Sequence, residues 1–120
     1  MDSSLIKFIL PAGMLEYFQL NNVTTHESII HIHLEENNTV PEEYKAVRLT
    51  SKGFYDEIKV QDFPLRGKKV FLLVKRRRWL NEDTGDIVHR NWDLVAQGTR
   101  MTQEFASFLK VILGYQTGKL

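Results

Sequence analysis

The feature that most constrains the fold of this chain is an apolar run that continues directly into four cations. Leu72, Leu73 and Val74 are followed by Lys-Arg-Arg-Arg at 75–78 and then by Trp79. Because side chains alternate along a strand, these cations point to both of its faces. Burying an unpaired charge is prohibitive, so the two faces cannot both pack on a core. We therefore expect this hairpin to project as a two-stranded arm with guanidinium groups exposed on each side.

The net charge of +1 hides an uneven distribution of charge along the 120 residues. Residues 1–64 hold five Lys/Arg and ten Asp/Glu, whereas residues 65–120 hold eleven and five. The segment 66–78 has seven cations and no acid. Such a basic half favours an anionic partner, commonly nucleic acid or an acidic protein. A solvated edge that prevents sheet aggregation is the alternative, but three adjacent arginines suit phosphate better.

Residues 1–36 are predicted to form a short N-terminal helix followed by a strand. Ser3 or Ser4 can cap the helix, which Pro11 ends. The segment 14–20 fits either a helical turn or a strand, and 21–28 is predicted to be a loop. Residues 28–36 alternate apolar with polar side chains, the pattern of a half-buried strand.

After a polar connection at 37–47, residues 54–94 are predicted to form a three-stranded antiparallel meander. Its turns are expected around Pro64 and Gly67 and at 81–86. Apolar residues recur at helical spacing within 99–114, which predicts a C-terminal helix that packs on the meander. The whole chain, 1–120, is thus predicted to be one α+β domain.

No pattern of catalytic residues or of a cofactor site is present. The chain has no cysteine, which excludes disulfides and thiolate zinc sites, and it lacks a Gly-rich phosphate loop and a nucleophile motif. His31 and His33 share one strand face without further ligands, so an outward-facing, solvated pair is expected rather than a metal site. No apolar run has the length of a membrane span. We expect a cytoplasmic, non-catalytic protein without cofactor or membrane contact.

The segments "SKGFYDEIKVQDFPLRGKKVFLLVKRRRW" and "GTRMTQEFASFLK", with "FILPAGMLEYFQL" and "SIIHIHLEE" before them, resemble the N-terminal region of bacterial insertion-sequence transposases, in particular the ISL-three group. Proteins of that group carry two Cys-x-x-Cys zinc pairs around a basic hairpin. This chain has "VPEEYKAV" (40–47) and "LNEDTG" (80–85) in their places. The resemblance implies a zinc-ribbon-like arrangement of hairpins without zinc. It also implies that the catalytic carboxylates lie on another polypeptide.

The leading hypothesis is a non-catalytic DNA-binding domain of such a transposase, which binds the terminal repeats of the element or holds DNA nonspecifically. A protein-interaction module that docks the catalytic chain or forms a homodimer is the main alternative, and a decayed fragment is a third. Trp79 and Trp92 are expected in the core more than on a recognition surface. The residues expected to contact DNA are Lys68, Lys69, Lys75, Arg76, Arg77, Arg78, Arg90 and Arg100.

Overall fold

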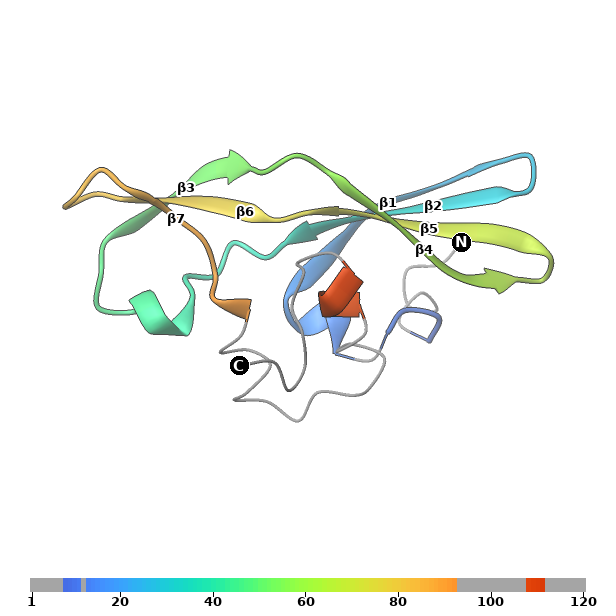
Figure 1. Ribbon diagram of the computed structural model, residues 1–120, viewed down its shortest axis with the longest axis horizontal. Coiled ribbons are helices and arrows are strands. Elements are labelled where there is room, and N and C mark those ends of the chain that lie inside the picture. The colour runs from blue at the N-terminus through green and yellow to red at the C-terminus, as the bar shows by residue number, and fades with distance from the viewer. Residues whose placement is uncertain (1–7, 12, 93–107, 112–120) are drawn as a thin grey trace.

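Two β-sheets lie end to end in an elongated layer, and short helical segments lie below it (Figure 1). This computed structural model describes residues 8–11, 13–92 and 108–111. The fold is mostly β-strand with few helices, a small α+β-like arrangement that contains antiparallel hairpins. The elements are η1 (Met14–Glu16), β1 (Phe18–His26), β2 (Ile29–Glu36), η2 (Glu42–Tyr44), β3 (Leu49–Phe54), β4 (Ile58–Leu65), β5 (Lys68–Lys75), β6 (Arg77–Asn81) and β7 (Ile87–Val88).

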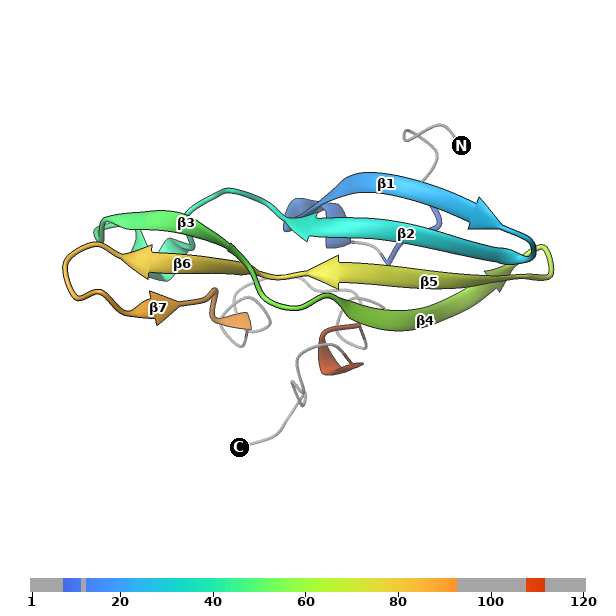
Figure 2. The same cartoon turned by 90° about the horizontal axis from the view of Figure 1, so that it is seen from above.

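The first sheet, sheet A, has four strands in the order β1-β2-β5-β4 (Figure 2). It consists of two antiparallel hairpins, β1–β2 and β4–β5. A parallel pair between β2 and β5 joins them, with Ile29 opposite Lys69 and Glu35 opposite Lys75. Both hairpin turns therefore lie at the same end of the molecule, where the Lys69 N–H donates to the Ser28 carbonyl at 2.9 Å.

The predicted alternation of β2 is confirmed. Ile30, Ile32 and Leu34 are buried, while the side chains between them are partly exposed. The inner face of sheet A packs against side chains from the segments below it, and the Phe18 ring stacks on Trp92 with centroids 5.4 Å apart. The other buried members of this core are Leu10, Met14, Val60, Val70, Leu72, Val74, Phe108 and Leu109. Trp79 is also buried, so both tryptophans lie inside the protein as expected.

The second sheet, sheet B, has three strands in the order β3-β6-β7. The meander predicted over 54–94 is correct in its two consecutive antiparallel hairpins but wrong as one sheet, because β4 and β5 lie in sheet A whereas β6 and β7 lie in sheet B. The chain passes from one sheet to the other at Arg76. From Lys68 to Asn81 the chain would extend over about 45 Å at the usual rise of a strand. This length allows the two halves of the segment to pair with different strands. β5 pairs with β2 and β4, and β6 pairs with β3 and β7.

Four smaller predictions concern the loop at 21–28, the connection at 37–47 and the two terminal helices. The loop predicted at 21–28 is wrong, since β1 continues to His26 as the edge strand of sheet A. The polar connection at 37–47 is confirmed and contains only η2. Of the predicted N-terminal helix, residues 8–10 form a turn and a bend, and 1–7 lie outside the described residues. Of the C-terminal helix, residues 108–111 are helical and the rest of 99–114 falls outside the described part.

Candidate nucleic-acid interface

The three adjacent arginines at the crossing between the sheets have different environments. Arg77 is only 8% exposed, whereas Arg76 and Arg78 are each partly exposed. The alternation of buried residues changes phase here: Val70, Leu72 and Val74 are the buried residues of β5, and Arg77 and Trp79 are those of β6. The change of phase places one arginine inside and leaves the other two partly at the surface.

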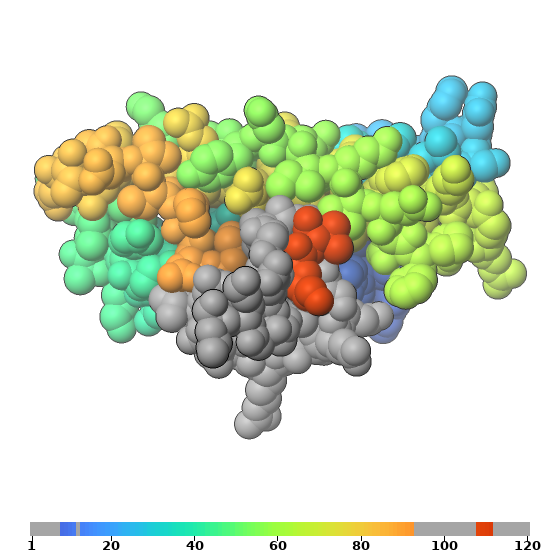
Figure 3. Space-filling model, in the orientation of Figure 1, coloured from blue at the N-terminus to red at the C-terminus, as the bar shows by residue number. Residues whose placement is uncertain are grey.

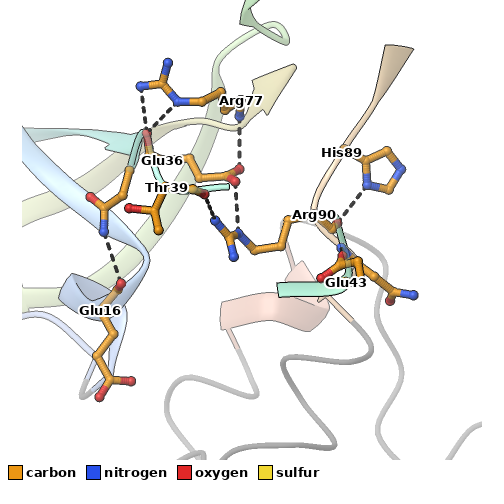
Figure 4. Close-up of polar contacts among 9 residues, drawn as sticks. Glu16, Glu36, Thr39, Glu43, Arg77, His89 and Arg90 are labelled. Atoms are coloured by element: carbon orange, nitrogen blue, oxygen red, sulfur yellow. Dashed lines mark hydrogen bonds and ion pairs between the residues drawn. The ribbon is translucent and has the colours of Figure 1, made fainter. Parts of the chain in front are cut away.

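Arg77 is held by internal hydrogen bonds. Its Nε and Nη2 donate to the Glu36 carbonyl at 3.2 and 3.1 Å (Figure 4). Its Nη1 donates to the Ser51 hydroxyl. Its backbone N–H donates to Glu36 Oε1 at 3.0 Å. The guanidinium also lies 4.6 Å from the centroid of the Phe54 ring. Arg77 therefore fixes the end of β2 to the start of β6.

Glu36 and Arg90 form a buried ion pair beside Arg77. Glu36 is 0% exposed and Arg90 is 7% exposed, with 3.1 Å between Oε2 and Nε (Figure 4). Arg90 also donates to the Thr39 carbonyl at 2.8 Å. Burial raises the pKa of the Glu36 carboxyl, and the Arg77 backbone N–H and the Arg90 guanidinium offset part of that rise.

The expectation that every cation of the basic run must be exposed is therefore wrong for Arg77. It is also wrong to treat Arg90 as a surface contact, because both guanidinium groups are buried and bind acceptors within the chain. Glu36 is the partner that sequence reasoning missed. A signal for it existed, since Glu36 follows Ile30, Ile32 and Leu34 at two-residue spacing and so falls on the buried face of β2.

Arg76 and Arg78 both contact one aromatic ring, that of Tyr55. Their guanidinium carbons are 5.1 and 5.8 Å from the ring centroid. The ring of His89 meets Tyr55 edge-on at 6.3 Å, and the Tyr55 N–H donates to the Arg76 carbonyl at 2.8 Å. We call these four residues, Tyr55, Arg76, Arg78 and His89, the Tyr55 cluster. No sequence motif identifies Tyr55 or His89 as a residue of a binding site.

Neither arginine of the Tyr55 cluster forms an ion pair within the described residues. The Arg76 Nε–H is buried and has no acceptor among them. Buried N–H groups are nearly always hydrogen-bonded in native proteins, so a donor without an acceptor calls for an explanation. An anionic oxygen is the strongest acceptor for a guanidinium. Because the Arg76 Nε–H is itself buried, the candidate anion site rests on the two partly exposed arginines and the Tyr55 ring that both contact.

The remaining residues predicted to contact DNA lie along sheet A or beyond the described residues. Lys75 is on the outer face, opposite Glu35 of β2. Lys68 and Lys69 are exposed at the turn between β4 and β5, and the Lys69 N–H donates to the Ser28 carbonyl at the turn between β1 and β2. Figure 3 shows these two turns, yellow-green and light blue, at one end of the molecule. Arg100 lies outside the described residues. The structure thus brings Arg76 and Arg78 together and separates them from the lysines at the hairpin end.

The chain matches no protein-family model, no curated protein and no solved structure. Over the described ranges, none of the helices is long and apolar enough to cross a membrane. The same residues contain no group of three His, Asp or Glu side chains that could hold a metal ion. The geometry of the basic surface is therefore the observation on which a function can be built.

Proposed function

We propose that this chain binds DNA as a non-catalytic, N-terminal or accessory domain of an insertion-sequence transposase, in the cytoplasm. The Tyr55 cluster carries the proposal, because Arg76 and Arg78 face one aromatic ring and no described carboxylate neutralises them. Lys75, at the end of β5, adds a cation beside this cluster, and Lys68 and Lys69 form a separate basic group at the hairpin end. Arg77 and Arg90 serve to build the surface rather than to contact DNA.

Two arginines beside a tyrosine suit a polyanion for two reasons. Guanidinium groups pair with phosphate oxygens through parallel hydrogen bonds, which a lysine cannot reproduce. The Tyr55 ring holds each guanidinium in place by a cation–π contact, so less side-chain entropy is lost when phosphate binds. Along β5 and β6, Lys69 and Arg78 are separated by about 30 Å at the rise of a strand. Such a surface can contact several phosphates at once.

The transposase context comes from the resemblance to the ISL-three group, and one spatial relation supports it. The segments 40–47 and 80–85 stand where that group has its cysteine pairs. In this chain Arg48, the residue directly after the first segment, contacts the second segment at the end of sheet B: it pairs with Asp83 at 2.6 Å, and its carbonyl accepts from the Glu82 N–H at 2.9 Å. A zinc-ribbon-like arrangement without zinc, with a C-terminal helix over 99–114, belongs to this proposal. The expected partners are the terminal repeats of the element and a separate catalytic chain, and a homodimer is compatible with it.

The direct test is fluorescence anisotropy with a labelled duplex that carries the terminal DNA of the element, at two salt concentrations. The double variant Arg76→Ala/Arg78→Ala is expected to weaken binding at least tenfold. It should also lower the dependence of log K on log salt by about two, one for each phosphate that the variant no longer binds. Arg48→Ala is the matched control, because Arg48 is an exposed arginine paired with Asp83 at the far end of sheet B.

Two results would count against the proposal. One is equal affinity of the double variant and the parent protein for the duplex. The other is binding by the parent protein that does not respond to salt. If the parent protein instead co-elutes with the catalytic chain at micromolar concentration while binding no DNA, the protein-interaction alternative is correct. Arg77 is left unchanged in these variants, because its removal would disturb the joint between the sheets.

A further inference from the structure

The outer face of sheet A is free of other described elements. The segments 8–11, 13–16 and 108–111 pack on the opposite, inner face (Figure 1). The paired residues of β2 and β5 on the outer face are partly exposed, among them His31 opposite Phe71 and His33 opposite Leu73. On the edge strand β4, Lys59 lies opposite Leu73 and Gln61 opposite Phe71. An aromatic ring thus stands near the middle of an open four-stranded surface.

Phe71 lies on the outer face of β5, and Phe63 is strongly exposed on the neighbouring strand β4. Phe71 has the Lys59 Nζ 4.3 Å above its ring centroid and the His31 ring 5.8 Å away. Phe63 is 81% exposed, an unusual position for a large apolar side chain. It follows Lys59 and Gln61 at two-residue spacing on β4, just where the register of β4 and β5 shifts. Its N–H donates to Asp62 Oδ1 at 2.8 Å, which helps to fix the local backbone.

The charges around these rings are mainly positive. Lys59 and Lys69 are exposed, and Lys75 is partly exposed. The acids on the same face are Glu35, opposite Lys75, and Glu57, whose Oε2 is 3.8 Å from His33 Nδ1. Lys59 and Lys69 flank the two phenylalanines and form no ion pair within the described part of the chain. The face therefore combines apolar rings with cations that are available to phosphate.

We propose that the outer face of sheet A binds single-stranded DNA, with bases stacked on Phe63 and Phe71 and phosphates bound by Lys59 and Lys69. This inference rests on the proposed DNA-binding function and names a second, neighbouring surface for it. Aromatic rings within a basic surface suit unpaired bases of any sequence, because every base has a π-face. In double-stranded DNA the faces of the bases are covered by their neighbours.

The width of the sheet favours a single strand over a duplex. Four strands at a spacing of about 4.8 Å place the two edge strands about 14 Å apart, before side chains are added. The major groove is about 12 Å wide and admits a helix or a two-stranded ribbon. A four-stranded face cannot enter it, whereas a flexible single strand can lie across the sheet. Lys59 has to leave the Phe71 ring when a base stacks there, and an exposed cation–π contact is weak enough to allow that.

The test is anisotropy with a labelled oligothymidine of about 12 nucleotides, a length within the usual site sizes, and with a duplex of equal length. Phe63→Ala and Phe71→Ala are each expected to weaken binding of the single strand by about 5- to 150-fold. Phe63→Tyr and Phe71→Tyr, which keep an aromatic ring, should bind nearly as well as the parent protein. Ile87→Ala, at an exposed apolar position of β7 in sheet B, is the control and should have no effect.

The outcomes separate this inference from the proposed function. If the single strand binds equally to the parent protein and to Phe63→Ala, the inference is wrong. If the parent protein binds duplex in a way that needs Arg76 and Arg78 but does not bind the single strand, the inference fails and the proposed function stands. If Phe63→Ala changes only self-association in size-exclusion chromatography, the face is an interface between copies of this chain. Phe63 is exposed, so its replacement leaves the fold intact even where Phe71→Ala disturbs it.

Discussion

Arg90→Met is expected to destabilise the protein strongly, because it leaves a buried carboxylate without its cation. Glu36 and Arg90 are 0% and 7% exposed, and 3.1 Å separates Oε2 from Nε. Removing one partner of a buried ion pair typically costs about 3–5 kcal/mol. The Arg77 backbone N–H still donates to Glu36 in the variant, so we expect a value near the lower end, about 3 kcal/mol. That is a large fraction of the stability of an ordinary domain.

The loss of stability should depend on pH, and its sign follows from the pKa of Glu36. Burial already raises this pKa above the ordinary value of 4.5, and removing Arg90 takes away one of the influences that lower it. A raised pKa in the folded state gives a stabilising contribution that is fully present below the unfolded pKa and is lost as pH rises through the folded pKa. The cost of Arg90→Met should therefore be largest at neutral pH and smaller near pH 5, changing by at most about 1.4 kcal/mol per pH unit.

Urea unfolding at pH 5.0 and at pH 7.5, followed by the fluorescence of the buried Trp79 and Trp92, measures both effects. Glu36→Gln/Arg90→Met should recover part of the loss at pH 7.5, because the neutral amide can still accept the Arg77 N–H. Arg48→Met removes an exposed arginine whose partner is also exposed, and it should leave the unfolding midpoint unchanged. A cost below about 1 kcal/mol for Arg90→Met, or equal costs at both pH values, would refute the reasoning.

Three further outcomes are expected. Gly67→Ala should lower the free energy of unfolding in urea by about 1–2 kcal/mol, because φ at Gly67 is 78° and an L-residue is strained there. An added Cβ would meet no atom within 4 Å, so the cost comes from the backbone alone. An unchanged midpoint would mean that the turn has another conformation. Trp92→Ala should cost about 3–5 kcal/mol, because the ring that stacks on Phe18 leaves a cavity; a cost under 1 kcal/mol would contradict that packing. EDTA should change neither the melting temperature nor DNA affinity, since the chain has no cysteine and its described residues show no alternative metal cluster; a fall in either would reveal a metal site.

The parts of the fold that could be predicted from the sequence are those with a strong hydrophobic alternation. Ile30, Ile32 and Leu34 predicted β2 correctly, and the Pro64–Gly67 region predicted the turn before β5. Residues 14–20, which contain the start of β1, were left open between a helical turn and a strand, and 21–26 were wrongly predicted as a loop, because only Phe18 of the nine residues of β1 is buried. The backbone pairing with β2 holds β1 in place, and such pairing leaves no mark on the side chains. The parallel contact between β2 and β5 was also missed, because it too is formed by backbone hydrogen bonds that produce no pattern of side chains in the sequence.

The site was predicted in outline and corrected in detail. The run at 75–78 marked the basic surface, but which arginine is buried depends on the change of phase at Arg76, where the chain leaves one sheet for the other. Sequence periodicity did not indicate which arginine is buried, because the groups that hold Arg77, the Glu36 carbonyl and the Ser51 hydroxyl, are distant in the chain. Tyr55 was missed because its role depends on cations some twenty residues away in the chain.

The parallel pairing of β2 with β5 has a consequence for how the protein assembles. It connects residues 40 positions apart, such as Ile29 and Lys69, whereas each hairpin forms from neighbouring segments. Closing a long loop is slow and costly in entropy, so we expect both hairpins to form first and to join afterwards. During synthesis, β2 is made well before β5 and then has one unpaired edge on an apolar strand. Newly made chains in which β2 has not yet paired with β5 are therefore the most prone to aggregate.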